Sequence, residues 1–409
     1  MVNVLNSWRH VSLSELVSFH KGGTLSKMDL AESGIPCVLY GELYTRYGEV
    51  TNRIHSRCSA VLHELTLSKE EDVLLPSSGE TPEEMAKATC VTIADVGIGG
   101  DIIIARPKPG ASGRFISYQL NHTLVNQVAS IAQGNAIVHL NAGRLASIQT
   151  VAPGEAEQRA IAEVLSGFDE HLANLDELIT KKKAIRDGAV EELVTGRTRI
   201  ADYRAPWVTR SARELLSDVI TGGTPSTTIA EYWDGGIPWL SSTEIHQRTV
   251  SRPTRYISEE GLANSSAQIA SAGSVLIALA GQGKTRGTSA YLTRDMALNQ
   301  SLAGLVADET ELYRGYLLYA VTRRYEELRG LSSGDGGRGG LNKTLLWDLR
   351  FTLPSSLEEQ CAIAEVLSGM DEEIRSLVEE RAKVERLKLG AMDDLLTGRV
   401  RLPLKEEAA

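Results

Sequence analysis

The sequence predicts an α/β (α+β) protein with two globular domains in tandem, related by pseudo-twofold symmetry and joined by two long antiparallel helices that form a coiled coil. Three observations predict this class: an internal repeat with a period of about 200 residues, a helical apolar stripe in each copy, and short β-branched runs between the copies. The chain has 409 residues, of which 42% are hydrophobic and 23% charged. That composition is ordinary for a globular protein, and the length suits two or three domains.

The repeat is the strongest of these signals. The segment EQRAIAEVLSGFDEHL…, which begins at Glu157, aligns without a gap on EQCAIAEVLSGMDEEI…, which begins at Glu359, and about half of the positions are identical over the full match. Chance composition does not produce a match of that length, so the chain is a tandem duplication. The expected parts are a first domain at 1–154, a first helix at 155–200, a second domain at 201–356, and a second helix with a tail at 357–409.

Both copies of the repeat are predicted to be long helices, because their apolar residues recur in steps of three and four. Ser355 and Ser356 each precede a glutamate by three residues, as in a capping box, and Gly196 and Gly398 are typical helix stops. About 40 residues make a helix roughly 60 Å long. The expected apolar stripe consists of Ile161, Leu165, Phe168, Leu172, Leu175, Ile179, Ile185, Ala189 and Leu193, and of Ile363, Leu367, Met370, Ile374, Leu377, Val384, Leu387, Ala391 and Leu395.

A helix of this length cannot bury its apolar stripe alone. The two copies are therefore expected to pack on each other, and their equivalence makes a twofold axis with antiparallel helices natural. The alternative is two separate helices, each lying on its own domain. The long charged faces favour the paired helices.

The two globular segments are related more faintly. Strands are expected at Val73–Leu75, Ile102–Ala105 and Val275–Ala280, a helix at Glu311–Leu328, and a glycine-rich loop at 331–340. The loops between the shared motifs differ completely, as expected of one scaffold that presents two different surfaces. The matching motifs are Lys21-Gly-Gly-Thr24 with Thr221-Gly-Gly-Thr224, Gly34-Ile-Pro36 with Gly236-Ile-Pro238, Asp72–Leu75 with Ser274–Ile277, and Asn126-Gln127 with Asn299-Gln300.

Charge and cysteine content narrow the class of protein. The net charge is −10, but most of the acidic excess lies in 155–200 (−3) and 357–409 (−5), which leaves room for basic loops on the domains. The four cysteines form no CxxC pair and have no histidine at metal spacing, so buried free thiols are expected. No apolar run of about 18 residues and no secretory signal are present, which predicts a cytoplasmic protein without a membrane partner.

The sequence contains no catalytic motif with the required residues and context. Ala278-Leu-Ala-Gly-Gln-Gly-Lys-Thr285 approaches a phosphate-binding loop, but its first glycine is missing and a strand-like run follows it. Its Lys284 and Arg286 suit a nucleic-acid backbone or a guanine edge instead. The chain has no Pro-Pro dipeptide and therefore no Asp/Asn-Pro-Pro-aromatic loop for N-methylation, and its eight histidines are scattered.

Two polar loops at equivalent positions carry the side chains that suit nucleic acid. Residues 40–47 (YGELYTRY) and 241–248 (SSTEIHQR) are rich in groups that stack on bases or hydrogen-bond to their edges. For any single residue, an ordinary solvated loop explains the sequence equally well. The presence of two such loops on one duplicated scaffold favours recognition.

These features together resemble the specificity subunit of type I restriction–modification systems, over essentially the whole chain. The resemblance rests on Thr221-Gly-Gly-Thr-Pro225, on Tyr232-Trp-Asp-Gly-Gly-Ile-Pro-Trp239, and on the Glu-Gln-x-x-Ile-Ala openings and Thr-Gly-Arg closings of both helices. The first half departs from the pattern, because Leu25 replaces the proline and Cys37 stands where the second half has Trp239.

The resemblance implies a non-catalytic DNA reader. Each domain would bind one half of a bipartite, asymmetric target in double-stranded DNA, and the helices would set the half-site spacing and dock two modification (methyltransferase) subunits, with restriction (translocase/endonuclease) subunits beyond them. S-adenosylmethionine and ATP with Mg²⁺ would belong to those partners, and this chain would hold no cofactor and no metal. The open alternatives are a stand-alone DNA-modifying enzyme and an interaction scaffold that uses only the helices. The expected DNA-contacting residues are Lys21, Thr24, Tyr44, Arg46, Tyr47, Ser78, Thr81, Thr224, Ser226, His246, Gln247, Arg248, Gln282, Lys284, Arg286, Arg338 and Lys343.

Overall fold

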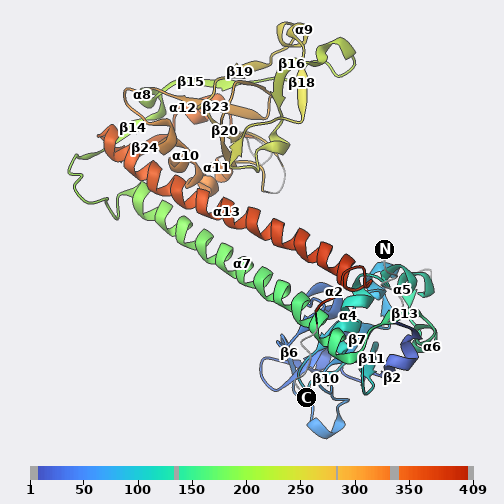
Figure 1. The fold of residues 1–409 in the computed structure, drawn as a ribbon. Helices are drawn as coiled ribbons and strands as arrows, with labels where there is room; N and C mark the ends of the chain where they lie inside the picture. Colours follow the sequence, from blue (N-terminus) through green and yellow to red (C-terminus); the bar gives the residue numbers. More distant parts are fainter. Residues whose placement is uncertain (1–7, 133–137, 282–283, 332–339, 404–409) are drawn as a thin grey trace. The chain divides into compact units, whose positions relative to one another are not determined.

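The computed structural model describes residues 8–132, 138–281, 284–331 and 340–403. By its internal contacts the chain divides into two units, Met1–Glu177 with Val378–Ala409 (unit 1) and Leu178–Leu377 (unit 2). Each unit holds one globular domain together with half of each long helix (Figure 1).

The centre of unit 1 is a five-stranded sheet in the order β2-β11-β7-β9-β5. Its strand β7 (Asp72–Pro76) is buried along its whole length, because both faces of the sheet are covered. Val73 and Leu75 point to the side of the helices, whereas Leu74 joins a cluster with Val38 of the second sheet. The other strands are β2 (Val17–Lys21), β5 (Val50–Thr51), β9 (Thr89–Val91) and β11 (Ile102–Pro107).

A second sheet and several helices complete unit 1. The second sheet has the order β10-β4-β6-β3, and α4 packs on β7 and β9 of the first sheet. Two short two-stranded sheets, β1-β13 and β12-β8, close the domain. The elements are β1 (Arg9–Ser12), α1 (Leu13–Leu16), β3 (Leu30–Ala31), β4 (Ile35–Val38), α2 (Tyr40–Thr45), β6 (Ser56–Cys58), β8 (Ser78–Gly79), α3 (Pro82–Met85), β10 (Gly97–Ile98), α4 (Gly113–Asn121), α5 (Val125–Ile131), β12 (Val138–His139), α6 (Ala142–Ala146) and β13 (Gln149–Ala152).

Unit 2 repeats this plan with the order β15-β23-β20-β21-β17 in its five-stranded sheet. Its second sheet, β18-β16-β22-β19, keeps the three strands that correspond to β6, β4 and β10 and adds β19 at the other edge. The elements are β14 (Trp207–Ser211), α8 (Ala212–Leu215), β15 (Leu216–Thr221), η4 (Ala230–Tyr232), β16 (Trp233–Leu240), η5 (Ser242–Glu244), β17 (Thr249–Val250), β18 (Arg255–Ile257), α9 (Glu259–Ala263), β19 (Gln268–Ala270), β20 (Val275–Ala278), β21 (Ser289–Leu292), β22 (Met296–Leu298), β23 (Leu302–Ala307), α10 (Arg314–Thr322), α11 (Tyr325–Gly330), α12 (Lys343–Trp347) and β24 (Arg350–Pro354).

Two expectations for the globular domains were wrong. The helix expected at Glu311–Leu328 is two helices, α10 and α11, which are separated near Arg324, whose guanidinium donates to the carbonyl of Arg350. Asn299-Gln300 lies in the turn between β22 and β23, whereas Asn126-Gln127 lies inside α5, so the two pairs are not equivalent. Most of the predicted glycine-rich loop, 332–339, lies outside the described residues.

The long helices α7 (Glu155–Thr195) and α13 (Leu357–Leu395) run antiparallel to each other within each unit (Figure 1). In unit 1, Arg381 pairs with Asp176, with 2.6 Å between Nε and Oδ1. In unit 2, Lys182 pairs with Glu373, with 2.6 Å between Nζ and Oε1. Ion pairs between charged side chains therefore link the two helices in each unit. Nowhere among the described residues is a helix long and apolar enough to cross a membrane.

The helices also join the domain cores, so the pairing and the packing on a domain both occur. Ile161 and Leu165 of α7 belong to the main core of unit 1, and Ile363 and Leu367 of α13 belong to the main core of unit 2. The apolar residues at three- and four-residue steps are therefore buried partly against the other long helix and partly against a domain core.

The predicted apolar stripe is wrong at one equivalent position of each helix. Ile185 and Leu387 are 50% and 52% exposed, and the cations that follow them point inward instead. The side chains of Arg186 and Lys388 are only 14% and 11% exposed. The stripe shifts there because each cation pairs with a partly buried carboxylate of the other long helix, Asp371 for Arg186 and Asp169 for Lys388.

Candidate nucleic-acid interface

Each domain presents one polar loop directly after the equivalent strand of its second sheet. In unit 1 the loop 40–49 follows β4 and contains α2, and in unit 2 the loop 241–248 follows β16 and contains η5. Both loops then enter a two-residue edge strand, β5 or β17, that pairs in parallel with its neighbour. Such short edge strands leave most of each loop to be fixed by side chains.

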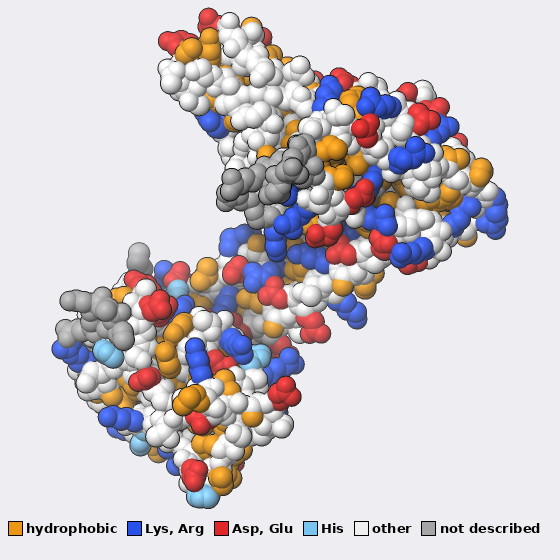
Figure 2. Space-filling view, turned by 180° about the vertical axis from the view of Figure 1, so that it is seen from behind, with side chains coloured by type: hydrophobic (Ala, Val, Ile, Leu, Met, Phe, Trp, Pro, Cys, Tyr) orange, Lys and Arg blue, Asp and Glu red, His pale blue; other side chains and the backbone are white. Residues whose placement is uncertain are grey.

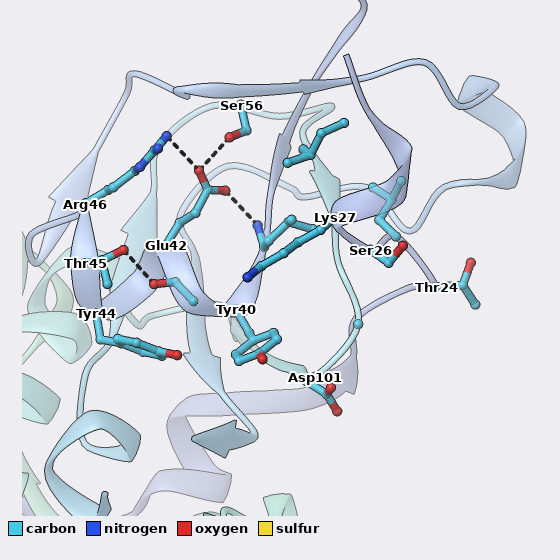
Figure 3. Close-up of a pocket in the computed structure, with 15 residues that line it drawn as sticks. Thr24, Ser26, Lys27, Tyr40, Glu42, Tyr44, Thr45, Arg46, Ser56 and Asp101 are labelled. Atoms are coloured by element: carbon cyan, nitrogen blue, oxygen red, sulfur yellow. Dashed lines mark hydrogen bonds and ion pairs between the residues drawn. The ribbon is translucent and has the colours of Figure 1, made fainter. Parts of the chain in front are cut away.

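Glu42 fixes the shape of the loop 40–49. Glu42 is buried, and its carboxylate accepts hydrogen bonds from the backbone N–H of Leu39 (2.9 Å) and from Ser56 Oγ (2.6 Å). Arg46 adds a looser ion pair, with 3.4 Å between Nη1 and Oε1 (Figure 3). The carboxylate thus closes the N-terminus of α2, where the free N–H groups of a helix favour an acceptor.

Glu244 does the same in the loop 241–248. Its carboxylate accepts from the backbone N–H of Thr254 (2.7 Å) and of Ser241 (3.2 Å). The two glutamates occupy equivalent positions in loops that otherwise differ. They hold the loops and leave the neighbouring side chains to vary.

A hollow of about 830 Å³ opens beside the loop 40–49 (Figure 3). Lys27 and Arg46 bring cations to it, and Tyr40 and Tyr44 bring aromatic rings. These groups can contact phosphates, stack on bases and hydrogen-bond to base edges. The other lining residues are Thr24, Leu25, Ser26, Leu30, Leu39, Gly41, Glu42, Thr45, Ser56, Gly100 and Asp101.

Glycines allow the segment after β2, and the equivalent segment after β15, to pass close to a neighbouring backbone carbonyl. A Cβ on Gly22 would lie 2.1 Å from the carbonyl oxygen of Gly99, and one on Gly222 would lie 1.8 Å from that of Leu298. No side chain fits there, which explains the shared Gly-Gly motif. In unit 2 the close approach brings Thr224 to Gln300, and its hydroxyl donates to Oε1 over 2.6 Å.

The structure gathers only part of the predicted set in the first domain. Thr24, Tyr44 and Arg46 line the hollow, and Lys21 is exposed at the end of β2. Tyr47 turns inward: its hydroxyl oxygen accepts from the N–H of His55 (3.1 Å), and burial raises its pKa.

Ser78 and Thr81 lie apart from the residues that line the hollow. Ser78 is in β8, and the hydroxyl oxygen of Thr81 caps α3 by accepting from the N–H of Glu84 (3.2 Å). Neither residue is among those that line the hollow, and the Thr81 hydroxyl has a structural role as a helix cap.

In the second domain, the predicted residues outside the loop 241–248 have mixed surroundings. Ser226 and Lys284 are exposed, and Arg286 is partly buried. Lys343 begins α12, with its Nζ 3.6 Å from Asp218. Gln282 and Arg338 lie outside the described residues.

Within the loop 241–248 the predicted residues divide. His246 and Gln247 are exposed, and His246 Nε2 lies 3.4 Å from Thr285 Oγ1. Arg248 points inward, with its Nε 2.7 Å from Oδ2 of Asp371 and its guanidinium 4.9 Å from the ring centre of Tyr319. Arg248 stays a predicted DNA contact, and in this structure its guanidinium is held by a helix carboxylate.

Two cations escaped the sequence analysis. Lys27 lines the hollow, and Arg255 of β18 lies 3.6 Å from the ring centre of Trp233 and 5.5 Å from that of Trp239. The Trp233-Asp-Gly-Gly-Ile-Pro-Trp239 motif was visible, but nothing in the sequence pairs it with Arg255. On the face drawn in Figure 2, basic and acidic side chains are interspersed, which suits short contact loops better than one broad basic surface.

Comparison with known proteins supports the resemblance to type I specificity subunits. Residues 205–386 match the sequence model of the "Type I restriction modification DNA specificity domain". The chain is similar to type I specificity subunits. A putative type I restriction enzyme MjaX specificity subunit of Methanocaldococcus jannaschii is 21% identical over 74% of this chain and 72% of that protein. The EcoR124I/EcoR124II specificity subunit of Escherichia coli is 27% identical over 39% of each chain.

Solved structures show that the similarity in fold extends over almost the whole chain. The S subunit of a type I restriction–modification system from M. genitalium covers 95% of this chain and 96% of its own length, with 15% identity and a TM-score of 0.65. A chain from a study of type I complex assembly and conformational transition covers 96% and 98%, with 17% identity and a TM-score of 0.57. The predicted fold class and the family resemblance are confirmed.

Proposed function

We propose that this chain is the non-catalytic DNA-reading subunit of a type I restriction–modification complex. The observation that carries the proposal is the pair of dissimilar polar loops, 40–49 and 241–248, on two like scaffolds of a specificity-subunit-like chain. Each domain reads one half of a bipartite site in double-stranded DNA.

The two halves of the target differ in sequence. Near its loop the first domain offers Lys27, Tyr44 and Arg46, whereas the second offers Thr224, His246 and Gln247. Arginine favours guanine and glutamine favours adenine in the major groove. Dissimilar side chains on equivalent loops therefore read different bases, which makes the site asymmetric.

The helices α7 and α13 set the distance between the half-sites. Each runs without a break through both units, and about 40 residues extend roughly 60 Å. Half-sites on one face of B-DNA lie about 34 Å or a multiple apart. A continuous helix is a stiff spacer for such a separation.

Two modification subunits dock on the helices. Each unit exposes an equivalent pair of apolar helix residues: Val164 with Leu387 in unit 1, and Val366 with Ile185 in unit 2. Two like patches accept two copies of one partner. S-adenosylmethionine then belongs to the modification subunits, and ATP with Mg²⁺ to the restriction subunits, so this chain holds no cofactor.

Docking is tested by introducing a charge on one patch at a time. Leu387→Glu and Ile185→Glu should each reduce the co-purified complex from two modification subunits to one, as measured by native mass spectrometry. Ile269→Glu, on an apolar residue of β19 that is 42% exposed, is the control and should keep two. Two bound copies in both helix variants would contradict docking at these patches.

The function itself is tested by co-expression with a cognate modification subunit. The complex should methylate adenines at one bipartite DNA sequence, and Lys27→Ala or Arg46→Ala should weaken that methylation. Turnover or a tightly bound cofactor in the isolated chain would favour the stand-alone enzyme. A complex that forms but never binds DNA selectively would favour the scaffold.

A further inference from the structure

Two partly buried polar clusters connect the loops 40–49 and 241–248 to the helix pair, one in each unit. In unit 1, Lys388 Nζ lies 2.6 Å from Asp169 Oδ1 and 2.9 Å from Glu49 Oε1. The hydroxyl of Tyr118 donates to Asp169 Oδ2 over 2.5 Å. The four side chains come from α13, α7, the end of the loop 40–49 and α4.

The cluster of unit 2 has the same construction. Arg186 Nη1 lies 2.7 Å from Asp371 Oδ1, and the hydroxyl of Tyr319 donates to Asp371 Oδ2 over 2.8 Å. Arg248, at the end of the loop 241–248, completes the cluster with 2.7 Å between its Nε and Asp371 Oδ2. Here the carboxylate comes from α13 and the inner cation from α7, so exchanging the two repeats maps one cluster on the other.

One member of each cluster differs in charge. The loop contributes Glu49 in unit 1 and Arg248 in unit 2, and each attaches to the helix group of opposite sign, Lys388 or Asp371. The side chains of these four residues are 11% to 28% exposed. Ion pairs with so little exposure are less screened than surface pairs, and they hold their partners in a defined geometry.

We propose that these clusters are latches that orient each reading loop against the helices, and that Glu49 and Arg248 are positioning residues for half-site recognition. The inference rests on the proposed DNA-reading function. Glu49 is not among the residues that line the hollow, and the guanidinium of Arg248 lies against Asp371. The adjoining edge strands β5 and β17 have only two residues each, so the latch supplies the orientation that the sheet does not.

The chain offers variants that release a loop without leaving a helix charge unpaired. Glu49→Gln keeps the Lys388–Asp169 pair, and Arg248→Met keeps the Arg186–Asp371 pair. Glu49→Gln should lower discrimination against mismatches about tenfold in the half-site read by the first domain only. Arg248→Met should do so in the other half-site only, and Arg248→Lys should restore it in part.

The measurement is sequencing of methylated adenines in cells that carry the complex with each variant. Arg381→Met, which removes the more exposed helix pair with Asp176, is the matched control and should leave both half-sites unchanged. Relaxation of both half-sites by one variant, or of neither while the unaltered complex methylates its site, would overturn the latch.

A second measurement does not depend on DNA. Hydrogen exchange of the isolated chain should speed up at the amides of 40–49 in Glu49→Gln and at those of 241–248 in Arg248→Met, with the rest of each domain unchanged. Unchanged exchange in both loops would contradict the latch, whatever the complex does to DNA. An unaltered complex that methylates no bipartite site would count against the proposed function, and the exchange measurement would still test the latch.

Discussion

At the scale of single residues, the loops depend on a few buried or partly buried carboxylates. Glu42 and Glu244 cap equivalent turns, and Asp169 and Asp371 sit at the centres of the two latches. The polar residues that vary between the domains surround these fixed points. Buried acceptors that lose their partners cost more than surface contacts, so substitutions here have measurable effects.

Glu42→Ala should lower the free energy of unfolding of its domain by about 1–3 kcal/mol. The substitution leaves the N–H of Leu39 and the hydroxyl of Ser56 without their acceptor. Urea unfolding followed by circular dichroism measures the change. Glu32→Ala, at an exposed position of the same domain, is the control and should have little effect. Equal stability of the two variants would contradict the capping role.

The latch of unit 1 predicts a pH dependence. Burial and then the charge of Glu49 raise the pKa of Asp169, whereas Lys388 lowers it. In Lys388→Met the cation is gone and the pKa of Asp169 rises further. Stability that comes from protonating a group with a raised pKa is present at low pH and is lost as the pH rises through its folded value.

Lys388→Met should therefore be destabilised more at about pH 8 than at about pH 5, relative to the unaltered chain. Lys388→Arg, which introduces the residue found at the equivalent Arg186, should match the unaltered chain at both pH values. Thermal unfolding at the two pH values measures the difference. If Lys388→Met lost the same amount of stability at both pH values, Asp169 would carry no uncompensated charge in the variant, which would contradict the prediction.

At the scale of elements, the long helices, the apolar strands and the repeat were predictable because each has a periodic signal. Val73–Leu75 and Val275–Ala278 are buried on both faces and appear in the sequence as unbroken apolar runs. The shift of the stripe at Ile185 and Leu387 was not predictable. Apolar spacing does not reveal that a neighbouring cation pairs with a partly buried carboxylate on the other helix.

The candidate site was predictable only in part for the same reason. The loop 40–47 was identified from its composition, and three of the predicted first-domain residues line the hollow. Arg248 has the same composition signal as Arg46, yet one faces inward and the other is exposed. The difference lies in the distant residue Asp371, which no local pattern connects to the loop.

Substitution of two glycines tests where α13 ends. Gly398 has φ +71°, and a Cβ there would lie 3.3 Å from the ring of Trp8. Gly398→Ala should destabilise unit 1 by about 1 kcal/mol, since the left-handed conformation disfavours alanine. Gly390→Ala, inside α13 with nothing near its Cβ, should instead stabilise it by up to about 1 kcal/mol. The same sign for both substitutions would contradict the assigned helix end.

At the scale of the whole molecule, the duplication gives each unit its own domain, proposed latch and proposed docking patch, and both long helices run through the two units. Inserting four residues after both Lys183 and Glu385, which are equivalent in the repeat, adds one helical turn to each helix, about 6 Å. The half-sites should stay the same while the spacer between them grows by about two base pairs. The motif of methylated DNA measures this, and an unchanged spacer would contradict the role of the helices.

The most direct test of the account is the methylome of a cell that expresses this chain with its modification subunit. The account predicts one asymmetric motif, made of two different half-sites separated by a fixed number of unspecified bases. A contiguous motif, a symmetric motif with identical halves, or methylation without sequence preference would contradict it.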